Sequence, residues 1–189
     1  MTEIRSKLLI ALGGNLPWGI SPPQNTLVQA IEMMPSLGVT VYSVSRFFAT
    51  PCFPDGAGPD YVNAAISVTA SGCPHRILAA LHRIEAHFGR VRDQRWGMRT
   101  LDLDLLAIGQ TILPDRATYL AWQGLAPQAQ ATAVPDQLIL PHPRLQDRAF
   151  VLVPLADIAP NWVHPVLNQT TTQLCAALPR ADVAAVRPI

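Results

Sequence analysis

Four stretches of the chain have the apolar pattern of β-strands, either as a short apolar run or as strict alternation. We expect these strands at residues 7–12, 39–48, 61–70 and 101–108. Two other stretches place apolar side chains three or four positions apart, which is typical of helices with one buried face. We expect these helices at residues 22–34 and 74–88, so the order is strand, helix, strand, strand, helix, strand.

This order of elements predicts an α+β protein with a ferredoxin-like βαββαβ core, in which helices pack on an antiparallel sheet. We expect three α-β-α layers with C-terminal additions, and a single domain over residues 1–189. Residues 111–137 look like an inserted loop, with a weakly periodic part from 117 that favours a surface loop or a short helix. A C-terminal extension is expected from about residue 161, with a further helix at 171–178.

Composition narrows the function classes. Hydrophobic residues make up 49% of the 189 residues, and the formal net charge is only +1, so no overall field attracts nucleic acid or an anionic membrane. No apolar run approaches the roughly 20 residues of a membrane-spanning helix. The three cysteines show no CxxC spacing, which favours reduced thiols in a cytoplasmic protein.

The stretch RWGMRTLDLDLL, residues 95–106, alternates leucine and aspartate. Residues two apart in a strand share a face, so Leu101, Leu103 and Leu105 point one way and Asp102 and Asp104 the other. Two adjacent carboxylates repel each other unless a cation binds, and Mg²⁺ typically binds one or two carboxylates together with substrate phosphates. The alternative is a solvated strand face, and spacing alone does not decide between them.

Arginines crowd the chain just before this strand. Arg90, Arg92, Arg95 and Arg99 fall within ten residues, and His142, Arg144 and Arg148 form a second group among prolines. Guanidinium groups bind phosphate through two parallel hydrogen bonds. An arginine-rich loop beside paired carboxylates therefore points to phosphoryl transfer, with a nucleic-acid contact or a solvated basic loop as the alternatives.

Tyr61 and Asn63 also share a strand face, where a ring and an amide could stack on and read the edge of a flat heterocycle. A strand face packed under a helix explains the pair equally well. The histidines lack the spacing of a zinc site, and Gly13-Gly14-Asn15 is not a P-loop.

Taken together, these motifs resemble one family. RWGMRTLDLDLL is preceded by RIEAHFGRVR and followed by LPHPRLQDRAFVLVPLADIAP, and ALGGNL and TPCFPDGAGPDYVNAAI occur earlier in the chain. The combination is similar to the 6-hydroxymethyl-7,8-dihydropterin pyrophosphokinases of folate biosynthesis. The resemblance implies a ferredoxin-like fold and transfer of the β,γ-diphosphate of ATP to the pterin hydroxymethyl group, with release of AMP. It also implies a monomer that acts on ATP and the pterin and binds neither nucleic acid nor membrane.

The resemblance further implies roles for individual residues. Two Mg²⁺ ions would be held by Asp102 and Asp104, and the catalytic set would be Arg90, Arg99, Asp102 and Asp104. The residues implied to bind ATP are His82, Glu85, Arg92, Trp96, Arg99, Leu105, His142 and Arg148. Those implied to bind the pterin are Thr50, Pro51, Phe53, Tyr61, Asn63, Trp96, Asp102 and Phe150.

The sequence departs from the family pattern at several points. Met98 stands where the family usually has proline, Gly14 replaces a frequent serine, and His82 often has glutamine as its counterpart. The loop between Arg92 and Arg95 is a residue shorter than usual, and the segment 105–141 is much longer. Two rival functions are an RNA-binding module with this fold, which the low net charge disfavours, and a catalytically silent pterin binder, which the intact charged residues disfavour.

Overall fold

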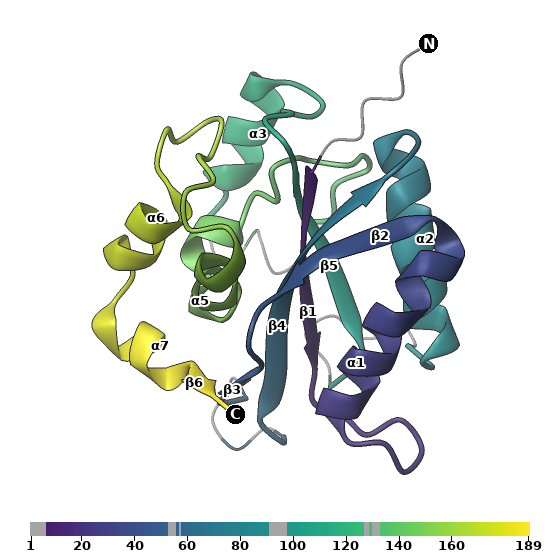
Figure 1. The fold of residues 1–189 in the computed structure, drawn as a ribbon. Helices are drawn as coiled ribbons and strands as arrows, with labels where there is room; N and C mark the ends of the chain where they lie inside the picture. Colours follow the sequence, from purple (N-terminus) through teal and green to yellow (C-terminus); the bar gives the residue numbers. More distant parts are fainter. Residues whose placement is uncertain (1–6, 53–55, 57, 91–97, 127–128, 130–132) are drawn as a thin grey trace.

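The computed structural model describes residues 7–52, 56, 58–90, 98–126, 129 and 133–189, which form an antiparallel sheet with helices on both faces (Figure 1). The six-stranded sheet has the order β5-β1-β4-β3-β6, and β2 pairs with β4 beside β3. Its strands are β1 Lys7–Gly14, β2 Val39–Val44, β3 Phe48–Thr50, β4 Tyr61–Ala70, β5 Asp102–Ile108 and β6 Arg187–Pro188. All the strand pairs are antiparallel, which confirms the predicted α+β class with an antiparallel sheet.

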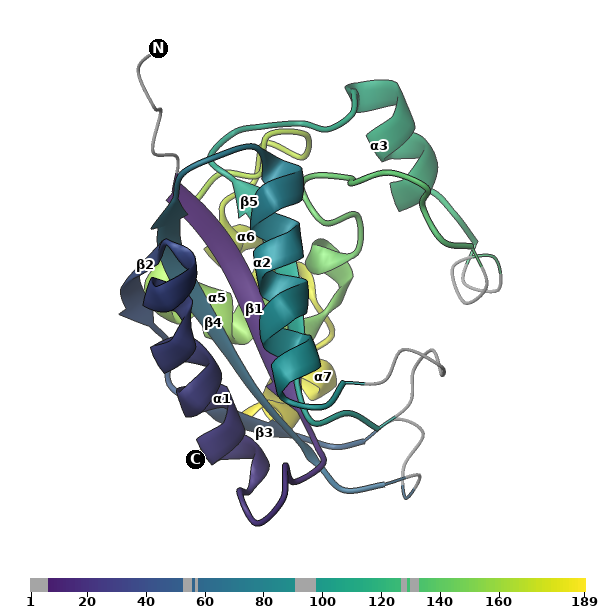
Figure 2. The ribbon, with the colours of Figure 1, turned by 90° about the vertical axis from the view of Figure 1, so that its right-hand side faces the viewer.

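The helices divide between the two faces of the sheet. In Figure 1, α1 and α2 lie on one side and α5, α6 and α7 on the other, while Figure 2 shows α3 standing off from the sheet. The α-helices are α1 Pro23–Met33, α2 Pro74–His87, α3 Arg116–Gln123, α5 Ala149–Ile158, α6 Thr171–Ala177 and α7 Arg180–Ala185. The described residues also form two 3₁₀ turns, η1 Met34–Leu37 and η2 Leu145–Asp147. In the described part of the chain, no helix is long and apolar enough to cross a membrane.

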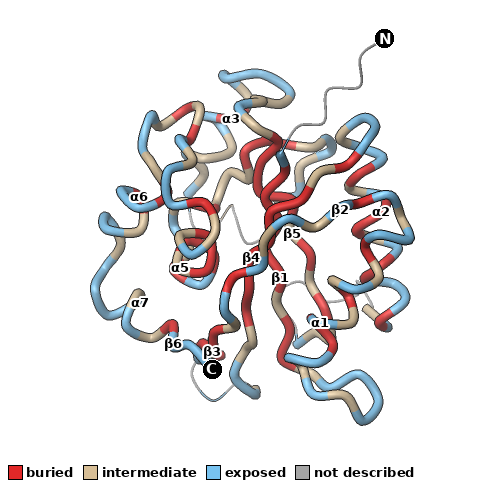
Figure 3. The backbone as a smooth tube through the Cα atoms, viewed as in Figure 1, coloured by how far each residue is buried: buried red, intermediate tan, exposed pale blue. Residues whose placement is uncertain are grey.

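The larger core lies between the sheet and the α1–α2 layer, where Figure 3 shows buried backbone along β1 and β4. Leu101, Leu103 and Leu105 are all at most 4% exposed and belong to this core, whereas Asp102 and Asp104 on the opposite face are only partly buried. The predicted alternation is therefore confirmed. It ends at a register shift opposite Leu9 and Ile10, where Leu106 joins the core on the other face.

The second core lies between the other sheet face and α5–α6 and covers only part of that face. Leu9 and Ala11 of β1 meet Val151, Leu152 and Leu155 of α5 there. This helix is apolar on most of its surface because it packs on the sheet along one side and on α6 along another. The sheet face beyond the N-terminal end of α5, where β5 begins, carries the polar residues of the candidate site.

The prediction of one continuous strand at 39–48 is wrong, because residues 45–47 separate β2 from β3. The Ser45 hydroxyl accepts the Ala65 N–H at 2.9 Å, so a side chain takes the place of a ladder carbonyl. Arg46 turns away from the sheet to bind Asp157 of α5 through two guanidinium hydrogen bonds of 2.8 and 2.9 Å. These long-range contacts end the first strand where alternation in the sequence continues.

The two ends of the chain also differ from expectation. The apolar run predicts that the first strand ends at Leu12, but β1 continues through Gly13 and Gly14. Instead of one C-terminal helix there are two, and β6 then pairs with β3 at the edge of the sheet. The 111–137 region contains the helix α3, one of the two forms expected for it.

A buried polar pair joins α3 to the segment before α6. The Tyr119 hydroxyl lies 3.1 Å from His164 Nε2, and neither residue is exposed. His164 Nδ1 accepts the N–H groups of Val166 and Leu167, both at 3.2 Å. Protonating Nδ1 would remove this acceptor, and burial lowers the pKa of His164 to about 4.

We therefore expect the protein to lose stability as the pH falls from about 6.5 to about 4. In that window the unfolded chain binds a proton at this histidine that the folded chain does not bind, so the free energy of unfolding falls, by on the order of 2–3 kcal/mol. Urea unfolding of the wild type and of His164→Asn at pH 7, 5.5 and 4 measures the effect. The variant should show a smaller pH slope, and exposed His75→Asn should keep the wild-type slope; equal slopes for all three proteins would contradict the assignment.

Candidate active site

Two polar residues, one from β5 and one from β4, lie in a row across the sheet on either side of β1 at the start of β5. Asp102 lies opposite Gly13 of β1, which in turn lies opposite Asn63 of β4. Residues paired across antiparallel strands point to the same face, so the carboxylate and the amide flank a position without a side chain. The next row contains Asp104, opposite Ala11 and Ala65. The floor between the polar groups is therefore made only of glycine and alanine.

The two glycines of β1 allow neighbouring segments to approach closely. A Cβ atom on Gly13 would lie 2.9 Å from Asn63 Oδ1, and one on Gly14 would lie 2.5 Å from the Thr100 carbonyl oxygen. The missing side chain at Gly14 thus lets the segment before β5 lie directly on β1. A serine at this position would need this segment to move.

Charged side chains of α2 and β5 form a chain at the sheet edge. Glu85, 1% exposed, accepts the Leu103 N–H at 2.8 Å and forms an ion pair with Arg90. Arg90 also pairs with Asp102 Oδ1, and Arg99 Nη1 lies 2.5 Å from Asp102 Oδ2. Two guanidinium groups therefore converge on one carboxylate of the predicted pair.

The second carboxylate faces the N-terminal end of α5. Asp104 Oδ2 lies 3.6 Å from Arg148 Nη1, and the Arg148 guanidinium carbon lies 5.7 Å from the centre of the Phe150 ring. The Asp104 side chain keeps 35% of its surface exposed, against 20% for Asp102. Asp104 is thus the more open of the two carboxylates.

The carboxylate pair has the chemistry of a magnesium site. Desolvation, and after it the neighbouring Asp104, raise the pKa of Asp102 above its usual value, while Arg99 and Arg90 act in the opposite direction. A divalent cation would relieve the repulsion between the two carboxylates. Among the residues that the structure describes, no group of three or more His, Cys, Asp and Glu side chains could hold a metal ion. Two carboxylates on one strand face suit Mg²⁺ that also binds phosphate oxygens and water.

His142 is held as a neutral hydrogen-bond donor. Its backbone N–H pairs with the Leu106 carbonyl at 2.8 Å, and its ring Nδ1 accepts the Arg144 N–H at 3.1 Å. Desolvation and the nearby Arg148 lower the pKa of His142 to about 3, so the ring is uncharged near neutral pH. Because Nδ1 is an acceptor, Nε2 carries the hydrogen and can donate to an anionic oxygen.

Several residues predicted to bind the pterin lie on β4, on or beside β3, and at the start of α5. The Asn63 amide donates to the Thr50 hydroxyl at 2.8 Å, and both side chains are buried. Tyr61 is half-buried, Phe150 is 39% exposed at the start of α5, and Pro51 is exposed beside Thr50. An amide edge and two aromatic rings thus come from β4 and α5, elements far apart in the sequence.

Other predicted residues take different positions. The Leu105 side chain is 4% exposed within the α1–α2 core, so only its peptide group could contact a nucleotide. His82 is half-buried on α2, three residues before Glu85. Arg92, Trp96 and Phe53 lie outside the described residues, so their roles stay predictions.

Sequence reasoning overlooked Asn15, which is 1% exposed. Its Oδ1 accepts the Arg99 N–H at 2.9 Å, and its Nδ2 donates to the Pro59 carbonyl at 3.1 Å. Asn15 thereby joins the segment that carries Arg99 to the segment that leads into Tyr61. The only signal in the sequence was its place directly after the two glycines.

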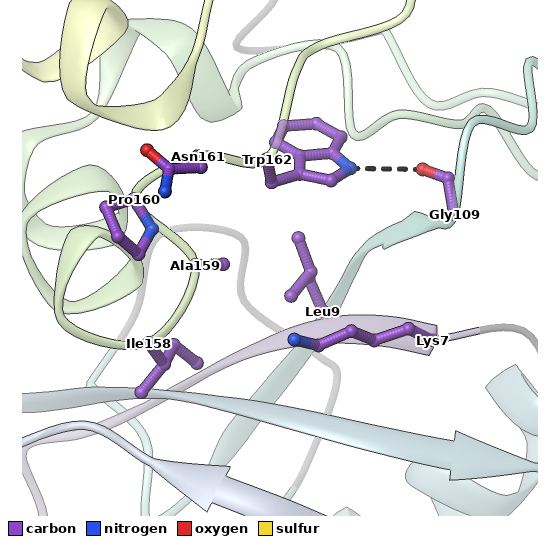
Figure 4. A pocket seen from close by; sticks show the side chains of 8 residues that line it. All are labelled: Lys7, Leu9, Gly109, Ile158, Ala159, Pro160, Asn161 and Trp162. Carbon is purple, nitrogen blue, oxygen red and sulfur yellow. Dashed lines mark hydrogen bonds between the residues drawn. The ribbon is translucent and has the colours of Figure 1, made fainter.

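A cavity of about 360 Å³ lies away from these residues, between the start of β1 and the end of α5. Figure 4 shows its lining, with the Trp162 indole nitrogen bonded to the Gly109 carbonyl at 3.0 Å. Its other lining residues are mostly apolar, and none of the predicted site residues is among them. The candidate site is the open polar surface at the start of β5, at a distance from this cavity.

The sequence model of the family described as 7,8-dihydro-6-hydroxymethylpterin-pyrophosphokinase matches residues 9–160. A 2-amino-4-hydroxy-6-hydroxymethyldihydropteridine pyrophosphokinase of Synechocystis is 37% identical over 96% of this chain and 79% of its own length. A protein of the same description from Methylorubrum extorquens is 31% identical over 96% of this chain and 99% of its own.

Solved structures agree in fold. The wild-type HPPK-DHPS of Plasmodium falciparum superposes with a TM-score of 0.63 over 93% of this chain, at 14% sequence identity. This chain spans only 45% of that protein. At such low identity the superposition supports the arrangement of sheet and helices alone.

Proposed function

The chain belongs to the 7,8-dihydro-6-hydroxymethylpterin-pyrophosphokinase family, and we propose that the residues around the start of β5 perform its reaction. The protein is an ATP-dependent pyrophosphokinase of folate biosynthesis that transfers diphosphate from ATP to hydroxymethyldihydropterin. The observation that supports the location best is the row Asp102–Gly13–Asn63. In this row the Asp102 carboxylate, with its arginines, lies on one side of a floor without side chains, and the Asn63 amide that would bind the edge of the pterin lies on the other.

Asp102 and Asp104 would hold two Mg²⁺ ions. Bound Mg²⁺ supplies positive charge that binds the phosphate chain and stabilises negative charge on it during transfer. The strand fixes the two carboxylates on one face, and the ion pairs of Arg90 and Arg99 keep the Asp102 side chain in place. The more open Asp104 leaves room for phosphate oxygens and water.

Three side chains, those of Arg99, Arg148 and His142, would act on the phosphates during the transfer. The pterin hydroxymethyl oxygen bonds to the β-phosphorus, the bond from that phosphorus to the α,β-bridging oxygen breaks, and AMP leaves with the electron pair. The hydroxyl proton passes to solvent. Arg99 and Arg148 supply fixed positive charge, and His142 Nε2–H donates to a phosphate oxygen, so that charge developing in the transition state meets donors already in position.

The pterin would lie between the rings of Tyr61 and Phe150, with its polar edge on Asn63. The hydrogen bond from Asn63 to Thr50 orients the amide, and Arg148 above the Phe150 ring links the pterin side to the phosphate side. A pterin ring held between two aromatic faces has little freedom to rotate, so its hydroxymethyl oxygen stays aligned for in-line attack on the β-phosphorus.

We also assign the fold to the ferredoxin-like class and the whole chain to a single domain. The element order β1-α1-β2/β3-β4-α2-β5 and the central pairing of β1 with β4 support the fold assignment. Contacts of α5 with β4, β1 and β3 support the single domain.

Product analysis tests the proposed function. Purified protein, MgATP and 6-hydroxymethyl-7,8-dihydropterin should give AMP and pterin diphosphate in equal amounts, with no product when Mg²⁺ is chelated. Nucleotides are resolved by ion-exchange chromatography, and a mixture without the pterin is the control. ADP in place of AMP would contradict diphosphate transfer, and bound pterin without turnover would indicate a silent pterin binder.

A further inference from the structure

The two ends of the long insertion after β5 lie side by side. Leu113 and Leu140 pair as an isolated antiparallel bridge, with N–H to carbonyl distances of 2.9 and 3.1 Å. The helix α3 lies between them and stands off from the sheet (Figure 2). Two residues after the bridge, His142 pairs with Leu106 of β5. The insertion therefore closes directly before the segment proposed to bind ATP.

The beginning and middle of α3 are fixed to the C-terminal region. Asp115 caps the helix by accepting the Thr118 N–H at 2.9 Å, and Arg116 donates to the Val166 carbonyl at 3.3 Å. Tyr119 is fully buried against His164, and the surrounding apolar cluster includes Ile139. This anchoring gives the far end of the helix a defined position.

The far end of α3 contacts the ATP side of the site through one arginine. Arg144 Nη1 donates to the Gln123 carbonyl at 3.3 Å, and Arg144 Nη2 pairs with Asp147 at 2.6 Å. The backbone N–H of the same Arg144 is the donor to His142 Nδ1. Arg144 thus connects the last turn of α3, the turn before α5 and the ring that we assign to a phosphate oxygen.

We propose that Arg144 is a positioning residue through which the insertion holds residues 142–148 ready for ATP. This inference rests on the proposed function, because it takes His142 and Arg148 as ATP ligands. A segment held in its binding geometry before ATP arrives loses less conformational entropy on binding. ATP affinity should therefore depend on α3, which itself lies outside the row of catalytic residues.

Arg144→Gln removes the charged link and leaves the backbone N–H in place. We expect the Kd for an α,β-methylene analogue of ATP, measured by calorimetry with Mg²⁺, to rise about tenfold, as expected when a preorganised segment loosens. The KM for the pterin and the kcat should stay within about twofold. Arg144→Lys should recover part of the affinity. The matched control is Arg180→Gln, which removes an exposed arginine of α7 and should leave the Kd within about twofold.

Tyr119→Leu separates positioning from direct phosphate binding. If α3 acts through Arg144, Tyr119→Leu also lowers the affinity for the analogue. The double variant Arg144→Gln/Tyr119→Leu should then bind the analogue no more weakly than the weaker-binding of the two single variants, because both substitutions break the same connection. Normal affinity in Tyr119→Leu, with weak affinity in Arg144→Gln, would overturn the proposal, because Arg144 would then act on the nucleotide directly. Should Tyr119→Leu fail to fold, Tyr119→Phe removes only the hydroxyl, and an effect of about threefold is expected.

Two further results would also overturn the inference: unchanged analogue affinity in Arg144→Gln, or an equal loss of analogue and pterin affinity. Wild-type product analysis separates this failure from failure of the proposed function. If the wild type forms AMP and pterin diphosphate while Arg144→Gln binds the analogue normally, the proposed role of Arg144 is wrong and the proposed function stands.

Discussion

Asp104→Asn should lower kcat by on the order of 10³-fold while leaving the fold intact. The change keeps the shape of the side chain and removes one of two carboxylates that share a strand face. Mg²⁺ then has a single charged ligand, and the phosphates lose the charge that neutralises them. Arg148, 3.6 Å from Asp104, loses its opposite charge as well.

The measurement is kcat over a range of Mg²⁺ concentrations, with the thermal midpoint as the check on folding. The variant should need more Mg²⁺ for half-maximal rate and should bind Mn²⁺, followed by electron paramagnetic resonance, more weakly. Asp182→Asn on the exposed face of α7 makes the same change of charge far from the site and should behave as the wild type. A kcat within tenfold of the wild type at unchanged Mg²⁺ dependence would rule out the metal assignment.

Asn15→Ala should lower kcat by on the order of 10²-fold and raise the pterin KM about tenfold. The substitution leaves the Arg99 N–H and the Pro59 carbonyl without their side-chain partner in a partly buried place, which costs about 0.5–1.5 kcal/mol for each hydrogen bond. Arg99 then loses its fixed position beside Asp102, and the chain leading into Tyr61 loses its tie to β1. Both substrates should therefore be affected, because Asn15 connects the two sides of the site.

Asn15→Asp distinguishes the two hydrogen bonds, since a carboxylate still accepts from Arg99 but cannot donate to Pro59. We expect it to recover most of kcat and to keep the raised pterin KM. Asn161→Ala, an exposed asparagine beside the distant cavity, is the matched control and should keep wild-type kinetics. Steady-state kinetics in both substrates provide the test, and equal losses in Asn15→Asp and Asn15→Ala would contradict separate roles for the two bonds.

The sequence predicted elements well wherever a local period decides the structure. The alternation in LDLDLL places leucines in the core and both aspartates on the opposite face, and the structure confirms that arrangement. The helical spacing of α1 and α2 was likewise readable, because each helix packs on the sheet along one stripe. The break at residues 45–47 was not readable, since it depends on Ala65 and Asp157, which are distant in the chain.

The family was also readable from sequence, because its motifs combine residue types at fixed spacings. Their geometry was not. Glu85 beside Arg90 and Asp102, Asn63 across Gly13 from Asp102, and Arg148 over Phe150 each join different elements. Asn15 has no feature of its own in the sequence that distinguishes it from a turn residue.

By itself, the sequence determined the antiparallel α+β class, the shared face of Asp102 and Asp104, and the family, because strand period and motif spacing are local properties. Only the tertiary structure decided which groups meet: the arginines on Asp102, the Asn15 link, and the contact of α3 with Arg144. These contacts depend on the pairing of β5 with β1 and on where α5 and α3 pack. Such packing results from burying apolar surface over the whole chain, so no short stretch of sequence encodes it.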